Sequence, residues 1–358
     1  MSRKQFSWLV ILAVLAAAIA VFMPRQTSRI ESFESAPLLP GFADQANTID
    51  WLRVTGAGDE VLATLERGPD HWTVDEVGGY AADWVVLRAL LAGLAQARVI
   101  EAKTSNPDYY DRLGVRDVAS PDAQGVMVSF RDDTGLPAVI LGNPARARDG
   151  QYARLDGATG SVLIDRELAL PKQREDWVDR AIVDIADDAV VEVEIRHADG
   201  DVVRARKASA DDEDFTLEGV ADGFEPKSAW SVNSLAGALA ALRLDDVVQE
   251  DEVDWTGATT YRLLTADGLE IRVELIDTPP LEEDEAAATQ HWLRLTAGIY
   301  TTGLDTGVSA ETDDATVLER AGAINERVAG WAYRIPEYKA ASMTKRLADL
   351  VQPIADGS

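Results

Sequence analysis

The fold is decided by two closely similar phrases, "LAGLAQARV" at residues 91–99 and "LAGALAALRL" at residues 235–244. Each belongs to an apolar stripe at helical spacing, which predicts a helix with one buried face. The stripes consist of Leu87, Leu90, Leu91 and Leu94 around the first phrase and of Val232, Leu235, Leu239 and Leu242 around the second. We therefore expect two similar helices in distant parts of the chain.

The strand patterns that surround these two phrases also repeat in the same order. A hairpin and a short strand precede each helix: "IDWLRV", "VLATLER" and "HWTV" in the first case, "VVEVEIR", "VVRARKA" and "FTLEGV" in the second. After the helices, "VMVSF", "AVILG" and "QYARL" find counterparts in "TYRLL", "LEIRVELI" and "HWLRL", and "SVLID" is a further strand of the first unit. Apolar and polar residues alternate along these runs, as in antiparallel sheets with one buried face.

The expected fold class is α+β. We expect an N-terminal transmembrane helix, then two duplicated units of antiparallel sheet with a covering helix, then a C-terminal helix–strand–helix segment. The predicted parts are a cytoplasmic tail at 1–5, a transmembrane anchor at 6–23, a tether at 24–46, a first repeat at 47–186, a second repeat at 187–300 and a C-terminal segment at 301–358.

The N-terminal segment predicts the location of the protein. Residues 6–23, "FSWLVILAVLAAAIAVFM", would form a helix of roughly 27 Å, close to the thickness of a bilayer core. Arg3 and Lys4 precede it and Pro24 ends it, which favours a single-pass plasma-membrane protein with a cytoplasmic N-terminus and a periplasmic or extracytoplasmic body. A cleaved signal peptide is the alternative, because Ala16-Ala17-Ala18 and Ala18-Ile19-Ala20 fit a cleavage site.

Charge and composition exclude several classes of function. The formal net charge of -28 disfavours binding to nucleic acid, whose phosphates the protein would repel. Cysteine is absent from the sequence, which excludes disulfides, thiolate metal sites and a cysteine nucleophile.

Two stretches offer candidate contact residues. In "GGYAAD", Gly78 and Gly79 predict a turn with positive φ, and Asp83 predicts the N-cap of the first helix. The alternative for this helix entry is a contact with a small ligand or a partner. In "WAYRIPEYK" and the helix that follows, aromatic and cationic residues suit a protein interface, although packing beneath the terminal helix explains them equally well. The candidate partner contacts are Trp331, Tyr333, Tyr338, Lys339, Lys345 and Arg346.

The sequence predicts no catalytic, cofactor-binding or metal-binding residues. The three histidines, His71, His197 and His291, lack ligand spacing. "GAGDEV" at 56–61 has valine where a dinucleotide fingerprint needs its third glycine. The acidic residues stand in consecutive runs, which are typical of solvated loops rather than of calcium loops.

Several longer phrases resemble one protein family over nearly the full length. These are "LLPGFADQANTI" at 38–49, "WTVDEVGGYAAD" at 72–83, "EAKTSNPDYYDRLGV" at 101–115, "DWVDR" at 176–180 and "INERVAGWAYRIPEYKAASMTKRLADLV" at 324–351. The chain resembles the domain of unknown function 4340 family. The resemblance implies a membrane-anchored bacterial protein encoded beside subunits of a gliding-motility-type ABC transporter. It assigns no role to any residue.

These observations give three functional hypotheses. The first is a non-catalytic, extracytoplasmic accessory or scaffold protein, with protein partners in an ABC-type transporter complex. The second is a binding module for an envelope lipid or glycan, held in a cleft between the two repeats. The third is an envelope hydrolase, which would need two carboxyl groups facing each other in a pocket.

Overall fold

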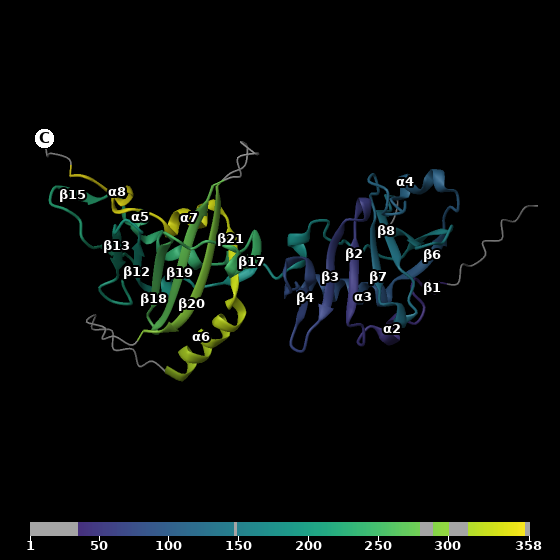
Figure 1. Ribbon diagram of the computed structural model, residues 1–358, viewed down its shortest axis with the longest axis horizontal. Helices are drawn as coiled ribbons and strands as arrows, with labels where there is room; N and C mark the ends of the chain where they lie inside the picture. Colours follow the sequence, from purple (N-terminus) through teal and green to yellow (C-terminus); the bar gives the residue numbers. More distant parts are fainter. Residues whose placement is uncertain (1–34, 147–148, 280–288, 301–313, 355–358) are drawn as a thin grey trace, which may run out of the picture.

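The strands of the two predicted repeats form two separate large sheets in the computed structural model, which describes residues 35–146, 149–279, 289–300 and 314–354 (Figure 1). All strand pairs in both sheets are antiparallel, and a few helices accompany them, so the fold class is α+β. The predicted cytoplasmic tail and the predicted anchor at 6–23 lie outside the described residues. Among the described residues, no helix has both the length and the apolar character to cross a bilayer.

The first sheet extends through the first unit. Its strands, in order across the sheet, are β1 (Ala36–Pro37), β6 (Arg98–Ala102), β10 (Ser161–Ile164), β9 (Gln151–Leu155), β8 (Val139–Pro144), β7 (Val126–Phe130), β2 (Trp51–Thr55), β3 (Val61–Arg67), β4 (Trp72–Val74) and β5 (Tyr80–Ala81). The accompanying helices are α2 (Phe42–Gln45), α3 (Trp84–Gln96) and α4 (Tyr110–Leu113). The described part of the predicted tether at 24–46 is therefore not a free connection, because β1 pairs with β6 and Phe42 of α2 is fully buried in the first unit. The four leucines of the predicted stripe are all buried on α3, so the first covering helix is confirmed.

The second sheet extends through the second unit. Its strands, in order, are β14 (Thr216–Leu217), β13 (Val202–Arg206), β12 (Val190–Arg196), β18 (Thr259–Thr265), β19 (Leu269–Thr278), β20 (Gln290–Ile299), β21 (Trp331–Ile335) and β17 (Asp246–Gln249). Two smaller pairs are β11 (Ala181–Val183) with β16 (Leu242–Arg243) and β15 (Phe224–Pro226) with β22 (Val351–Pro353). The helices are α5 (Ala229–Asn233), α6 (Asp314–Val328), α7 (Glu337–Met343) and α8 (Leu347–Leu350).

Eight strands have the same order in the two sheets. The first sheet reads β4-β3-β2-β7-β8-β9-β10-β6, and the second reads β14-β13-β12-β18-β19-β20-β21-β17. The correspondence also follows the order of the strands along the chain, with α6 added between β20 and β21. Strand β21 comes from the predicted C-terminal segment, so this segment completes the second sheet.

The second covering helix is shorter than the apolar stripe predicts. Helix α5 ends at Asn233, a 3₁₀ turn follows at 236–239, and Leu242 lies in strand β16. The hydroxyls of Ser231 and Ser234 donate to backbone carbonyls three residues earlier, which competes with regular helix formation. Ala241 has a φ of 45°, which an α-helix does not permit. The stripe residues are nevertheless buried.

The helix predicted for the C-terminal segment is also divided. The run "EYKAASMTKRLADLV" forms α7 and α8, with a break at residues 344–346. The hydroxyl of Thr344 donates to the carbonyl of Ala340, and the Asp349 carboxylate accepts from the backbone N–H of Arg346 at the start of α8. Met343 and Leu350 are buried on either side of this break.

The turn before α3 has the predicted conformation. Gly78 and Gly79 have φ angles of 67° and 82°, in the left-handed region that favours glycine. The carboxylate of Asp83 accepts from the backbone N–H groups of Val85 and Val86 at 2.8 and 3.1 Å, so Asp83 is the N-cap of α3.

Loss of this cap gives a first testable prediction. We expect Asp83→Ala to lower the free energy of unfolding by about 1 kcal/mol, because two N–H groups lose their acceptor. Asp83→Asn should retain most of the stability, since asparagine is an equally good cap. Urea denaturation followed by circular dichroism measures both. An unchanged stability of Asp83→Ala would show that the cap contributes nothing, and equal losses for the two variants would contradict the role of the side-chain acceptor.

Candidate functional site

The two units meet at an aromatic contact. Tyr80 of β5 packs edge-on against Trp331 of β21, with ring centroids 4.9 Å apart, and its centroid is 6.0 Å from that of Tyr333. Tyr80 and Tyr333 are both buried. Burial raises the pKa of each phenol, so both remain protonated near neutral pH. This contact joins residues that lie far apart in the sequence.

The glycine turn lies beside this contact. The side-chain amide of Gln249, at the end of β17, donates to the carbonyl of Gly78 at 3.4 Å. A Cβ atom at Gly78 would lie 3.2 Å from that amide nitrogen and 3.7 Å from the Trp331 ring. Glycine therefore supplies both the positive φ of the turn and the close approach of the two units.

Residues 165–189, between β10 and β12, form a connecting segment that contacts both units. The backbone N–H of Asp83 donates to the carbonyl of Trp177, which ties the segment to the first unit. Arg180 donates to the carbonyl of Leu244 at 3.0 Å and forms an ion pair with Asp245 at 3.3 Å in the second unit. Arg327 of α6 lies 3.5 Å from the Asp179 carboxylate. The segment is thus fixed on both sides of the junction.

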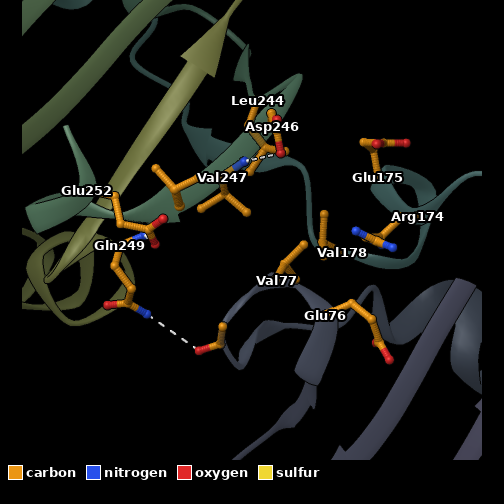
Figure 2. A pocket seen from close by; sticks show the side chains of 12 residues that line it. Glu76, Val77, Arg174, Glu175, Val178, Leu244, Asp246, Val247, Gln249 and Glu252 are labelled. Carbon is orange, nitrogen blue, oxygen red and sulfur yellow. Dashed lines mark hydrogen bonds between the residues drawn. The ribbon is translucent and has the colours of Figure 1, made fainter. Parts of the chain in front are cut away.

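A cavity of about 300 Å³ opens in this junction (Figure 2). The first unit, the connecting segment and the second unit each contribute to its wall. The residues that line it are Glu76, Val77, Gly78, Arg174, Glu175, Val178, Leu244, Asp246, Val247, Val248, Gln249 and Glu252. Its wall therefore combines valine and leucine side chains with four carboxylates, one guanidinium and one amide.

Most of the cavity carboxylates hold the backbone in place. Glu76 accepts from the N–H of Thr64 at 2.6 Å, and Glu252 accepts from the N–H of Gln249 at 3.2 Å. Asp246 accepts from the N–H of Val247 at 2.9 Å. In Figure 2, Glu76 and Glu175 point in different directions from separate elements. The cavity thus offers hydrogen-bonding groups around an apolar wall, rather than a facing pair of acids.

A neighbouring carboxyl has an altered acidity. Burial raises the pKa of Asp75, and the carboxylates of Glu66 and Glu76 add to this effect. Asp75 precedes Glu76 in the same 3₁₀ turn, so negative charge is concentrated on the first-unit side of the cavity.

The predicted contact residues fall into two groups. Gly78, Gly79, Trp331 and Tyr333 lie at the junction, where Tyr333 is fully buried and is a contact within the chain. The others lie on or after α7. Tyr338 is 70% exposed, and the amine of Lys339 donates to the carbonyls of Gly237 and Ala240.

Lys345 and Arg346 contact the turn between β12 and β13. The ring Nε2 of His197 lies 3.3 Å from the carbonyl of Lys345. The guanidinium of Arg346 pairs with Asp199 at 2.9 Å and with Asp201 at 3.3 Å. These two residues therefore bind the C-terminal segment to the second sheet, and their role as partner contacts stays a prediction.

No sequence pattern predicts Arg174, Glu175, Asp246 or Gln249 as site residues. Gln249 ends a short strand whose neighbour, β21, is formed more than eighty residues later, and no local pattern marks it. Among the cavity residues, Glu76 is close in sequence to a predicted feature, because it belongs to the phrase at 72–83 that contains the glycine turn.

The three histidines lie in separate surroundings. His71 lines a different hollow beside Trp72 and Trp84, His197 contacts Thr259 and Lys345, and His291 lies 2.7 Å from the Asp277 carboxylate. Over the described ranges, histidine and acidic side chains form no cluster that could hold a metal ion.

Comparison with known proteins identifies one family. The sequence model of a family described as "Domain of unknown function (DUF4340)" matches residues 72–263, which is more than half of the chain. The matched range includes the glycine turn, the connecting segment and β17, and it ends before β21. No curated protein and no solved structure matches the chain.

Proposed function

The chain belongs to the DUF4340 family, and we propose that it acts as a non-catalytic, membrane-anchored accessory protein of an ABC-type transporter. The observation that carries this proposal is the junction, at which Tyr80, Trp331 and Gln249 join two sheets of the same strand order. A two-part body of this kind presents two similar surfaces in a fixed relation, which suits a scaffold that holds partner subunits.

The sequence supplies the location that the proposal needs. The apolar segment at 6–23 would anchor the chain in the plasma membrane and leave the body on the extracytoplasmic side. We interpret the repeated strand order as an internal duplication, in which α6 was added to the second copy.

Affinity purification tests the accessory role. The tagged full-length chain is recovered from gently solubilised membranes, and its co-purifying proteins are identified by mass spectrometry. The proposal expects both the membrane and the ATPase subunits of one transporter. Recovery of the chain without any transporter subunit, before and after cross-linking, would contradict it. A reporter fused after Ser358 independently determines on which side of the membrane the body lies.

The cavity supports a second candidate function, in which the junction binds part of an envelope glycan. Its volume of about 300 Å³ is at the lower end of the range for ligand sites. Carboxylates and the Gln249 amide could accept and donate hydrogen bonds to sugar hydroxyls, while Val77 and Val247 would contact the apolar face of the ring.

Two cavity variants test this second candidate. Native mass spectrometry of the purified chain should detect a bound saccharide, and its occupancy should fall about tenfold in Gln249→Ala, which removes one polar contact. Val77→Phe should abolish binding by filling the space. The matched control is Gln96→Ala, an exposed glutamine of α3 outside the cavity. Equal occupancy in all three variants would exclude the cavity as the site.

A further inference from the structure

The second unit carries an exposed apolar surface at its outer end. Phe224 is 44% exposed and Ile354 is 52% exposed, and both line one groove. Trp230 of α5 is 77% exposed but is not among the residues that line this groove. Figure 1 shows β15, α5 and α8 together at the end of the second unit that lies farthest from the first unit. Large aromatic and aliphatic side chains gathered in this way mark an interaction surface more often than scattered single residues do.

This surface surrounds a groove of about 630 Å³. Strand β14 supplies one wall, β15 with Ile354 supplies another, and Ala229 and Val232 of α5 complete it. Phe215 and Leu217 are 8% and 6% exposed and connect the groove to the core. We call these elements the outer groove.

Hydrogen bonds fix the outer groove in position. The N–H of Ile354 donates to the carbonyl of Gly223 at 2.9 Å, and Phe224 pairs with Pro353 in the β15–β22 ribbon. The side-chain carbonyl of Asn233 accepts from the N–H of Phe215 at 3.0 Å, which ties α5 to β14. These hydrogen bonds already fix the walls of the groove in the free protein. Binding of a partner would therefore cost less conformational entropy than binding to a flexible surface.

The charge around the outer groove is negative. Asp214, Asp222 and Glu225 line it, and within the described part of the chain none of the three forms an ion pair with Lys or Arg. The nearby amines of Lys207 and Lys227 donate instead to the carbonyls of Asp188 and Asp349. Asp214 accepts from the side-chain amide of Asn233 at 2.7 Å and Glu225 from that of Gln352 at 3.2 Å, and these neutral donors do not neutralise the negative charge. An apolar groove with such carboxylates at its edge complements a segment that is apolar on one face and cationic beside it.

We propose that the outer groove binds an amphipathic, lysine- or arginine-bearing segment of a partner protein. This inference rests on the proposed accessory function, because it names the surface by which such an accessory would hold its partner. An anionic membrane surface is disfavoured as the occupant, since the same carboxylates would repel its head groups.

Fluorescence anisotropy tests the chemistry of the occupant with the purified full-length chain in detergent. The probe is a labelled amphipathic peptide of leucine and lysine, about 18 residues long, and its counterpart contains leucine and glutamate. The lysine peptide should bind, and its affinity should fall at least about tenfold in the double variant Phe224→Ala, Ile354→Ala, because the large apolar side chains that line the groove are its anchors. The glutamate peptide should not bind.

Two controls separate the groove from the general negative charge of the chain. Trp84→Ala removes an exposed tryptophan of the first unit and should leave the affinity unchanged. Asp222→Lys with Glu225→Lys should weaken binding of the lysine peptide, whereas Asp132→Lys with Asp133→Lys on the first unit should change it little. Equal affinity for the groove variants and their controls would overturn the proposal, and so would equal binding of the two peptides.

Purification from membranes distinguishes failure of the groove from failure of the accessory function. If the wild-type chain and the Phe224→Ala, Ile354→Ala variant recover the same transporter subunits in equal amounts, the outer groove is not the contact and the accessory function stands. If the wild-type chain recovers no transporter subunit, the accessory function fails, and the peptide experiment alone decides the groove. Binding of the wild-type chain to phosphatidylglycerol vesicles, lost in the double variant, would assign the surface to the membrane and overturn the proposal.

Discussion

Replacement of Arg262 with methionine is expected to lower the free energy of unfolding by about 3 kcal/mol, because three carboxylates would lose the cation between them. Arg262 of β18 lies between β12 and β19, where its guanidinium contacts Glu192 and pairs with Glu270 at 3.3 Å. The carboxylate of Glu194 lies 3.8 Å from the same guanidinium. Their side chains are only 12–16% exposed, so water would replace the guanidinium poorly.

The expected loss should depend on pH. Burial alone would raise the pKa of Glu194, but hydrogen bonds from Arg204 and Arg196 and the charge of Arg262 outweigh it and lower the pKa. A carboxylate with a lowered pKa stabilises the fold above its unfolded value and loses that contribution as the pH falls through the folded value. Without Arg262 the folded pKa of Glu194 rises, so the difference between variant and wild type should shrink on acidification below about pH 5.

Chemical denaturation of both proteins at a series of pH values measures this effect. Arg262→Lys should recover part of the stability, since it retains the charge but not the forked geometry. The matched control is Arg272→Met, which removes an arginine that also pairs with Glu270, at 2.6 Å, but is 62% exposed. We expect a loss below about 1 kcal/mol there. Equal losses for Arg262→Met and Arg272→Met would contradict the argument from burial.

The sequence predicts the parts of this fold that depend on local pattern. Alternation along "LEIRVELI" and "VVEVEIR" is sufficient to identify β19 and β12, because one face of each strand is buried. Asp83 and the four leucines after it predict where α3 begins and which face it buries, because an N-cap and an apolar stripe are both local features of the sequence.

Distant contacts explain where such prediction fails. The apolar stripe that begins at Val232 has helical spacing, as that of α3 does. However, the amine of Lys339 donates hydrogen bonds to the carbonyls of Gly237 and Ala240. The hydroxyl of Tyr261 also donates to the carbonyl of Leu235 at 2.8 Å. Both donors are too far away in the sequence for an analysis of local hydrophobic spacing to include them. Tertiary contacts of this kind commonly override intrinsic helix propensity.

The sequence predicts residues on each side of the candidate site, but not that the two sides are in contact. Gly78 and Gly79 predict a turn from their backbone conformation, and Trp331 and Tyr333 are candidate contacts because they are aromatic residues near cations. Nothing local indicates that Tyr80 lies between the two groups, because β5 and β21 belong to different sheets. The cavity between them arises from the docking of the units, which no single motif encodes.

Replacement of Tyr80 with alanine should have a still larger effect, because this ring fills the contact between the two units. Removal of a buried aromatic side chain costs about 3–5 kcal/mol, and Tyr80 is 3% exposed against Trp331 and Tyr333. We also expect the thermal unfolding of the chain to separate into two transitions, one for each sheet, since their aromatic contact is lost. Differential scanning calorimetry measures both the stability and the number of transitions.

Two comparisons make the result specific to the junction. Tyr80→Phe retains the ring and should unfold as the wild type does, with a small loss at most. Phe42→Ala removes a fully buried ring that packs on Phe130 inside the first unit, 5.3 Å between centroids, without touching the junction. It should destabilise the protein by a similar amount and leave the two units coupled. If Tyr80→Ala and Phe42→Ala gave the same single transition, the aromatic contact would not couple the units, and a scaffold function based on that coupling would lose its physical basis.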